Sequence, residues 1–167
     1  MALHKTLLLI RHAKSSWDIG IKSDFERTLN ERGKKDAPAM AERLIKKKIL
    51  INAFVASPAT RAKKTAAYFC TAYGVPNNEI IFISKLYHAA CDDFKDVVSN
   101  LNNSLHTVAI FSHNPGITEF INQLAPSIQI ADMPTCGIFA VQIHTTNWKA
   151  FDTAQKEFLF FDYPKMD

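Results

Sequence analysis

The chain has 167 residues, of which 47% are hydrophobic and 22% are charged. These proportions are typical of a globular protein and exclude a disordered chain, and no apolar run is long enough to cross a bilayer. The formal net charge of +4 favours an anionic partner, but the basic residues are scattered, so we expect no nucleic-acid partner.

The length suits one domain, and we expect residues 1–167 to form a single one. The first apolar run is too short for the core of a signal peptide and leads directly into Arg11 and His12. We therefore expect a cytoplasmic protein without a membrane partner. The three cysteines are widely spaced and form no CxxC pair, so they predict neither a disulfide framework nor a zinc site.

The first candidate site follows a strand near the N-terminus. Residues 6–10 form an apolar run that predicts a buried strand, and Arg11 and His12 come directly after it. In a parallel α/β sheet, ligands bind just beyond the carboxyl ends of the strands. Arginine binds phosphate oxygens in pairs, and a neutral imidazole can attack phosphorus. Taken alone, the stretch also fits an Arg11 that pairs with a surface carboxylate beside an ordinary loop histidine.

The next segments predict a loop and then a helix. Residues 18–27 are polar without periodicity, which indicates a loop over the site. Asn30 is expected to cap a helix that runs to about Lys48. Its inner stripe would comprise Ala37, Ala41, Leu44 and Ile45. Pro38 would remove a helical hydrogen bond, so we expect a kink or a later start of the helix there.

Two further strands end in polar turns. After the short strand 53–56, a helix reaches Tyr73, and Arg61 lies in its first turn, where free N–H groups favour an anion. The strand 107–111 leads to His113, and a second helix follows. Arg61 alone could be a solvated helix residue, and His113 alone could be structural. Cationic or imidazole side chains at three strand ends nevertheless indicate one shared site.

The remaining strands are predicted over residues 79–83, 136–143 and 157–163, with a helix over about 92–101. The last strand is expected at a sheet edge because Pro164 closes it. The alternation of strands and helices predicts an α/β fold of three layers, α/β/α, with a mostly parallel sheet and helices on both faces.

The combination of Arg11, His12, Arg61 and His113 suits phosphoryl transfer. A transferring phosphoryl group carries spread negative charge, so its catalysis depends mainly on positioning and on positive donors. The two arginines would hold the oxygens and favour the neutral form of His12, with one of its ring nitrogens held by a backbone carbonyl. His113, if protonated, would add a third positive donor.

Specific motifs extend over nearly the whole chain: LLLIRHAKSSW, DFERTLNERG, SPATRAKKTA, SHNPGITEFINQLA and MPTCGIFAV. With these motifs the chain resembles the histidine phosphatase superfamily, which has a phosphoglycerate-mutase-like fold. It looks most like the SixA-type phosphohistidine phosphatase branch of that superfamily.

The resemblance implies that the phosphate pocket consists of Arg11, His12, Arg61 and His113 and that His12 becomes phosphorylated as an intermediate. It also implies that the protein uses no metal and no other cofactor. Ser16, which lies in the first motif, and His88 are assigned to substrate binding together with the pocket.

Two departures from the family pattern concern the turn after the first strand and the proton donor. The usual Arg-His-Gly is Arg-His-Ala here, so Ala13 would adopt a backbone geometry that glycine normally supplies, or the turn would differ. The glutamate acid of larger relatives has no clear counterpart. The candidates for a general acid are His88, Asp18, Asp92 and water.

The expected activity is dephosphorylation of phosphohistidine on a protein, such as a histidine-containing phosphotransfer domain. Short connections between strands and helices would leave the pocket open to a protein surface. One alternative is a phosphomonoesterase of the same fold that acts on a small phosphorylated metabolite, and another is a non-catalytic phosphate-binding module. A metal site of His12, His88 and His113 is disfavoured, because two nearby arginines would repel a divalent ion.

Overall fold

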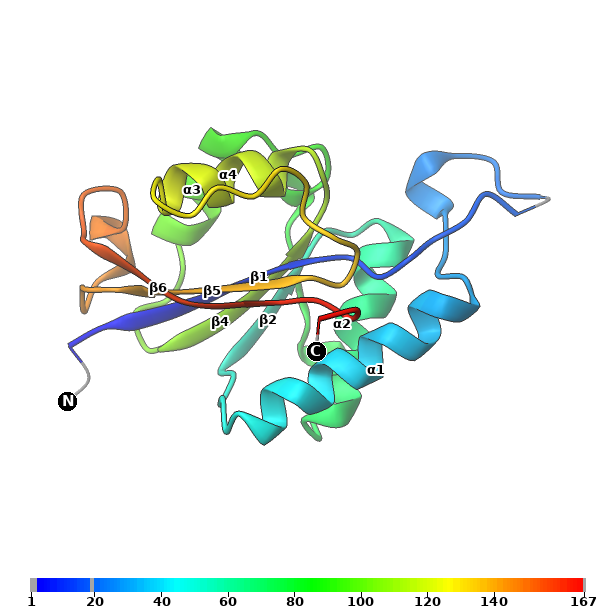
Figure 1. Ribbon diagram of the computed structural model, residues 1–167, viewed down its shortest axis with the longest axis horizontal. Coiled ribbons are helices and arrows are strands. Elements are labelled where there is room, and N and C mark those ends of the chain that lie inside the picture. Colours follow the sequence, from blue (N-terminus) through cyan, green and yellow to red (C-terminus); the bar gives the residue numbers. More distant parts are fainter. Residues whose placement is uncertain (1–2, 19, 167) are drawn as a thin grey trace.

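A six-stranded sheet lies between two layers of helices in the computed structural model, which describes residues 3–18 and 20–166 (Figure 1). The strands are β1 (Lys5–Arg11), β2 (Ala53–Ala56), β3 (Ile81–Phe82), β4 (Thr107–Ser112), β5 (Ile138–Ile143) and β6 (Lys156–Asp162). The helices are α1 (Glu31–Lys46), α2 (Thr60–Ala72), α3 (Cys91–Ser99) and α4 (Gly116–Leu124). Short 3₁₀ turns are η1 (Asp24–Glu26), η2 (Asn77–Glu79), η3 (Ser84–Leu86) and η4 (Trp148–Ala150).

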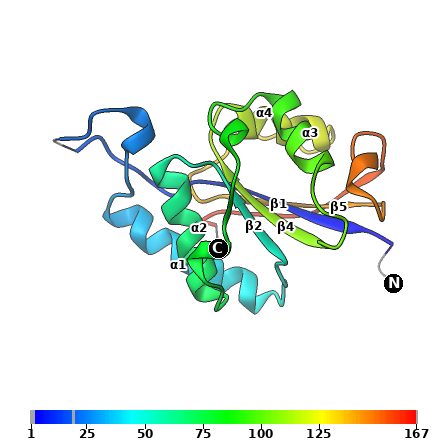
Figure 2. The same ribbon diagram turned by 180° about the vertical axis from the view of Figure 1, so that it is seen from behind.

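The strand order is β3-β2-β4-β1-β5-β6. The first four of these strands are parallel, whereas β5 pairs antiparallel with both β1 and β6. Helices α3 and α4 cover one face, and α1 and α2 cover the other (Figures 1 and 2). The expected three-layer α/β fold is therefore confirmed, with an antiparallel pair added on one side and β6 at the edge.

Alternate residues of β1 face opposite helical layers. Leu7 and Leu9 belong to the hydrophobic cluster that includes α3 and α4, whereas Leu8 and Ile10 belong to the cluster of α1 and α2. All of these side chains are completely buried. Burial on both faces explains why the strand is a continuous apolar run rather than an alternating one.

The expected later start of the helix at Pro38 is wrong, because α1 runs from Glu31 to Lys46 with Pro38 inside it. The Asn30 side chain caps the helix as predicted, accepting a hydrogen bond from the Gly33 N–H at 2.9 Å. The buried stripe of α1 consists of Gly33, Ala37, Met40, Ala41 and Leu44. Packing of this stripe outweighs the cost of a proline in a helix, about 3 kcal/mol.

Strand β3 is shorter than predicted. Only Ile81 and Phe82 pair with β2, both are exposed, and residues 77–79 form the turn η2 instead. The strand lies at the edge of the sheet and so has one neighbour, which limits how much pairing it gains.

The chain between β1 and α1 projects beyond the helical layers, as the blue segment of Figure 1 shows. A bridge between Ser15 and Leu29 joins its two sides, and η1 lies near its far end. Among residues 3–18 and 20–166, no helix is long and apolar enough to cross a membrane.

Candidate active site

The three strand ends singled out in the sequence meet at one place. Strands β2, β4 and β1 are adjacent and parallel, so their carboxyl ends lie along the same edge of the sheet. His12 follows β1, Arg61 lies in the first turn of α2 after β2, and His113 follows β4. The ring centroids of His12 and His113 are 5.2 Å apart, and Arg61 Nε lies 3.3 Å from His12 Nε2.

The His12 ring is held in one orientation by its two nitrogens. Nδ1 lies 2.8 Å from the backbone carbonyl of Ala13, which can only accept, so Nδ1 carries the ring hydrogen. The lone pair of Nε2 then accepts from Arg61 Nε. A carbonyl partner for one nitrogen was expected from the sequence, and the structure identifies it as Ala13. Nε2 is therefore the ring nitrogen of His12 that carries no hydrogen.

His12 is also kept neutral. Burial lowers the pKa of the imidazole well below its usual value, and the positive or polar neighbours His113, Arg61 and Arg11 lower it further. The hydrogen bond to the Ala13 carbonyl acts in the opposite direction but does not compensate. A neutral imidazole retains the lone pair that attack on phosphorus requires.

The backbone around His12 is fixed from three sides. The His12 N–H donates to the Ser112 carbonyl at 3.1 Å, and the Cys136 N–H donates to the His12 carbonyl at 3.0 Å. Cys136 reaches this carbonyl with a left-handed φ of 58°. The Ala13 N–H donates to Thr65 Oγ1 at 2.9 Å. Ala13 has no positive φ, so it does not need the backbone geometry of glycine, and the turn is built without it.

Arg61 is fully engaged with the site and with a carboxylate that the sequence analysis missed. Its Nη1 donates to the Asp24 backbone carbonyl at 2.7 Å, and its Nη2 donates to Asp24 Oδ2 at 2.9 Å. The Tyr87 hydroxyl donates to the same Asp24 oxygen at 2.8 Å. Asp24 thus joins the projecting segment to the phosphate pocket. It is the first residue of the DFERTLNERG motif, which was the available signal.

Asp24 is suited to orient Arg61 rather than to donate a proton. Burial by itself would raise the pKa of this carboxyl, but hydrogen bonds from Tyr87 and Arg61 and the charges of Arg61 and Arg27 outweigh it, so the pKa is lowered. Asp24 is consequently ionised at neutral pH. The predicted acid candidates Asp18 and Asp92 are both exposed, the former on the projecting segment and the latter in the first turn of α3.

His113 is neutral in the ligand-free structure. Burial and the charge of Arg61 lower its pKa to about 3, so a protonated His113 is not the resting state, contrary to the condition considered from the sequence. Its Nε2 lies 2.8 Å from Ser57 Oγ. His113 can still contribute to the pocket as a neutral donor or acceptor.

Five buried polar atoms have no hydrogen-bond partner among the described residues. Two of them, Arg27 Nε and Thr28 Oγ1, belong to the projecting segment, and the other three are Arg11 Nε, His113 Nδ1 and Ser16 Oγ. Leaving a buried polar group unpaired costs about 1–3 kcal/mol, so such groups call for an explanation. All three belong to residues assigned to the phosphate pocket or to substrate binding. Arg11 is anchored through Nη1, which donates to the Met133 carbonyl at 2.7 Å.

His88 lies at the rim rather than in the buried cluster. It is exposed, has a φ of 56°, and stacks on Tyr87 with ring centroids 3.9 Å apart. His88 and His113 line the same cavity of about 250 Å³. Among the residues that the structure describes, no group of three or more His, Cys, Asp or Glu side chains is arranged to hold a metal ion.

Comparisons with known proteins agree with this geometry. The model of the histidine phosphatase superfamily (branch 1) matches residues 7–86. An uncharacterized chloroplastic protein of Arabidopsis thaliana is 27% identical over 157 residues, which cover 89% of this chain and 71% of that protein.

Solved structures named for the phosphohistidine phosphatase SixA share the fold. The structure from Nakamurella multipartitia has a TM-score of 0.81 at 20% identity and covers 99% of both chains. The structure from Agrobacterium tumefaciens has a TM-score of 0.78 at 20% identity, with 96% of this chain and 98% of that chain covered. A protein histidine phosphatase SixA complexed with tungstate has a TM-score of 0.79 at 21% identity, with 95% and 97% covered. Residues 7–86 therefore match the histidine phosphatase superfamily, and the chain is a phosphatase with the fold of the SixA-type proteins.

Proposed function

We propose that this phosphatase removes phosphate from phosphohistidine on a protein. We further propose that the phosphoryl group is first transferred to His12 and then released by water. The observation that supports this most is the state of His12. It is neutral, its Nδ1–H is held by the Ala13 carbonyl, and its Nε2 lies between Arg61 and His113. A pure binding site for phosphate has no need of a nucleophile prepared in this way.

In the first step the hydrogen bond from Arg61 Nε to His12 Nε2 breaks, and the freed Nε2 lone pair attacks phosphorus. A new N–P bond forms, the P–N bond to the substrate imidazole breaks, and its electron pair stays on the substrate nitrogen, which takes a proton from water. Arg11 and Arg61 bind the phosphoryl oxygens, where negative charge is spread in the transition state. Asp24 keeps the Arg61 fork in place through two hydrogen bonds.

In the second step water attacks the phosphorus on His12. The N–P bond breaks, its electron pair returns to Nε2, and inorganic phosphate leaves. The attacking water loses a proton, which neutral His113 can accept because its ring centroid lies 5.2 Å from that of His12.

The proposed substrate class rests on the lack of a well-placed general acid among the described residues of the site. An alkyl alcohol leaves as a strongly basic alkoxide, so a positioned acid contributes about 10²- to 10⁴-fold to its departure. The carboxylate that pairs with Arg61, Asp24, is ionised and already hydrogen-bonded, and His88 is an exposed residue. Imidazole leaves phosphohistidine without so strong an acid. One similar structure is that of the protein histidine phosphatase SixA in complex with tungstate, which is an oxyanion.

A substrate panel tests this proposal. Turnover of a phosphohistidine-containing phosphotransfer domain should be compared with that of aryl phosphates of graded leaving-group pKa and with sugar phosphates. We expect kcat/KM to fall steeply as the leaving group becomes more basic, with sugar phosphates turned over poorly. The variant His88→Ala should slow alkyl esters more than phosphohistidine if His88 supplies a weak acid. A flat dependence, with sugar phosphates used as well as phosphohistidine, would favour the small-molecule phosphomonoesterase instead.

A further inference from the structure

A second cavity adjoins the candidate active site and shares Arg11 with it. It has a volume of about 450 Å³, and its charged lining consists of Arg11, Lys14, Arg32, Lys165 and Asp132. This volume lies within the range of ordinary ligand pockets. None of the steps proposed above uses Lys14, Arg32 or Lys165.

The cations reach this cavity from separate parts of the chain, and close packing brings two of those parts together. The Asn30 N–H donates to the Lys14 carbonyl at 3.0 Å, just before α1 begins. A Cβ atom on Gly33 would lie 2.2 Å from the same carbonyl oxygen, so only glycine permits this approach. Arg32, the residue before Gly33, is thereby held next to the chain that carries Lys14.

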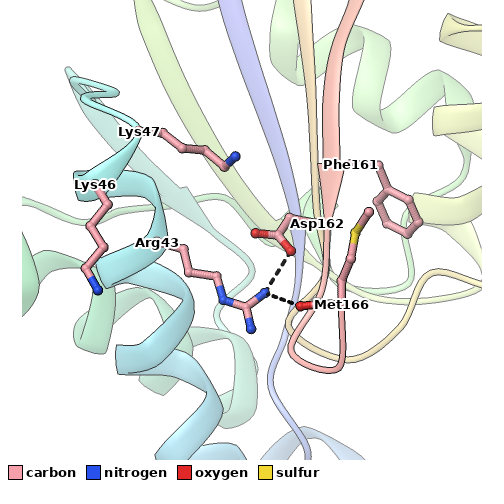
Figure 3. Close-up of a pocket in the computed structure, with 6 residues that line it drawn as sticks. All are labelled: Arg43, Lys46, Lys47, Phe161, Asp162 and Met166. Carbon is pink, nitrogen blue, oxygen red and sulfur yellow. Dashed lines mark hydrogen bonds and ion pairs between the residues drawn. The ribbon is translucent and has the colours of Figure 1, made fainter.

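The C-terminal segment that carries Lys165 is held against α1 by Arg43. Arg43 Nη1 donates to Asp162 Oδ1 at 2.8 Å, and its two Nη atoms donate to three backbone carbonyls within residues 163–166 at 2.9–3.2 Å. Figure 3 shows Arg43 of α1 pointing to Asp162 and Met166, inside a separate cavity of about 570 Å³. Lys165 is thus held next to the same helix that carries Arg32 in its first turn.

Positive charge dominates the cavity beside Arg11. Of its charged lining residues, four are cations and one, Asp132, is a carboxylate. Asp132 already accepts a hydrogen bond from the Asn114 side chain at 2.6 Å. Arg32 forms an exposed pair with Asp36 at 3.3 Å, and a pair of this kind contributes little to stability, so it does not bind Arg32 firmly. The cavity is therefore built to attract an anion.

We propose that this cavity binds an acidic side chain of the phosphoprotein substrate, close to its phosphohistidine; this inference rests on the proposed function. Lys14, Arg32 and Lys165 are exposed, so their charges stay hydrated. Hydrated rim cations suit a salt-sensitive contact with an acidic protein surface, which speeds and selects encounter. Arg11 connects the two sites, because it is the last residue of β1, next to His12, and also lines the cavity.

The test compares two synthetic phosphohistidine peptides that differ only in the flanking residues, Glu and Asp in one and Gln and Asn in the other. Each is measured as a substrate and as a competitive inhibitor of para-nitrophenyl phosphate hydrolysis, at low and high salt. The triple variant Lys14→Ala, Arg32→Ala, Lys165→Ala removes the rim cations. Its matched control is Lys46→Ala, Lys47→Ala, Lys149→Ala, which removes the same charge from exposed lysines outside this cavity.

The wild-type protein should prefer the acidic peptide by about 10-fold, because several exposed ion pairs add up although each is weak. The triple variant should lose this preference, and the loss should appear in KM or in the inhibition constant. Its turnover of para-nitrophenyl phosphate should be unchanged. High salt should abolish the preference of the wild-type protein in the same way. The control variant should keep the preference. Retained preference in the triple variant, or equal loss in the control, would overturn the proposal.

The inhibition arm separates this inference from the proposed function. If neither peptide is turned over while para-nitrophenyl phosphate is, the proposed function fails, yet the inhibition constants still decide whether the cavity selects acidic peptides. A small aryl bisphosphate and its monophosphate complete the panel. If the protein prefers the bisphosphate to the monophosphate but does not distinguish the two peptides, the cavity binds a second anion of a small molecule and not an acidic side chain of a protein. That result would overturn the proposal.

Discussion

The buried cluster of His12, Arg61 and His113 lies on one side of Arg11. The exposed cations Lys14, Arg32 and Lys165, here called the basic rim, lie beside Arg11 in the adjoining cavity. The two groups differ in burial and in hydrogen bonding. His12, Arg61 and His113 are 5%, 5% and 6% exposed, and each is held by backbone or side-chain hydrogen bonds. Lys14 and Lys165 of the rim are exposed. Burial keeps the two histidines neutral and holds Arg61 next to His12, whereas exposure leaves the rim cations hydrated. The chemistry and the selection of substrate are therefore expected to respond to different substitutions and to different conditions.

The largest effect should come from removing the nucleophile of the buried cluster. His12→Ala deletes the atom that we propose attacks phosphorus, so kcat should fall on the order of 10³-fold or more. Steady-state kinetics on an aryl phosphate would measure this, with thermal unfolding as a check on folding. His144→Ala, which alters an exposed histidine paired with Glu157, should leave kcat unchanged. Near-normal turnover by His12→Ala would remove the basis of the mechanism.

Replacing the buried arginine should produce the next largest loss. Arg61→Ala should lower kcat/KM about 10²-fold or more, as when one transition-state donor is removed. Arg61→Lys keeps a charge but loses the planar fork that contacts His12 and Asp24, so it should restore little activity. Kinetic constants for both variants would decide this. Full recovery with lysine would show that charge alone matters and that the fork does not.

A smaller loss is expected when Asp24 stops orienting Arg61. Asp24→Asn keeps the shape and can still accept hydrogen bonds but loses the charge, so kcat should fall about 10-fold, with the same dependence on leaving-group pKa. Asp18→Asn, on the same projecting segment but exposed, should behave like the wild type. If the loss grows sharply for alkyl esters compared with aryl esters, Asp24 is a proton donor and its assignment as a positioning residue is wrong.

The smallest effect concerns stability in acid. The pKa of His113 is lowered from 6.5 to about 3 in the folded protein, so below pH 6.5 the unfolded chain binds a proton that the folded protein does not. His113 therefore makes stability decrease as the pH falls from about 6.5 towards about 3, and it has no such effect above this range. Denaturant unfolding of His113→Gln should show a weaker decrease with acidification than the wild type. An unchanged decrease would mean that His113 is protonated in the folded protein.

The positions of Arg11, His12, Arg61 and His113 could be predicted because they depend on local patterns. Each follows a buried apolar run, and in a parallel sheet the carboxyl ends of neighbouring strands lie together. Burial on both faces makes such runs conspicuous in a sequence. The family-specific motifs lie at the same places, so the local and the global signals agree.

The contact between Asp24 and Arg61 could not be predicted in this way. Asp24 lies in a polar segment without periodicity, 37 residues before Arg61, and only the fold of the projecting segment brings the two together. The same holds for Tyr87, whose hydroxyl meets Asp24 across the site. Long-range contacts between irregular segments leave no spacing rule in the sequence.

At two positions the residue type alone does not decide the local structure. Pro38 disfavours a helix interior, but the buried stripe of α1 holds the helix together across it. Ala13 replaces a glycine of the family motif, yet no positive φ is needed at that position. Tertiary packing decides whether the helix continues through Pro38, and the path of the backbone decides whether the turn at Ala13 needs glycine. Residue type alone predicts neither the packing nor the backbone path.

The most direct test of the account is to trap the phosphoryl group on His12. Rapid quench of the protein with substrate labelled in the phosphoryl group should give acid-labile, base-stable label on the protein within a single turnover, and mass spectrometry of alkaline digests should locate it on His12. The label should be absent from His12→Ala and present in the Lys14→Ala, Arg32→Ala, Lys165→Ala variant. Label on any other residue, or turnover with no labelled protein at any time point, would contradict a phosphohistidine intermediate at His12.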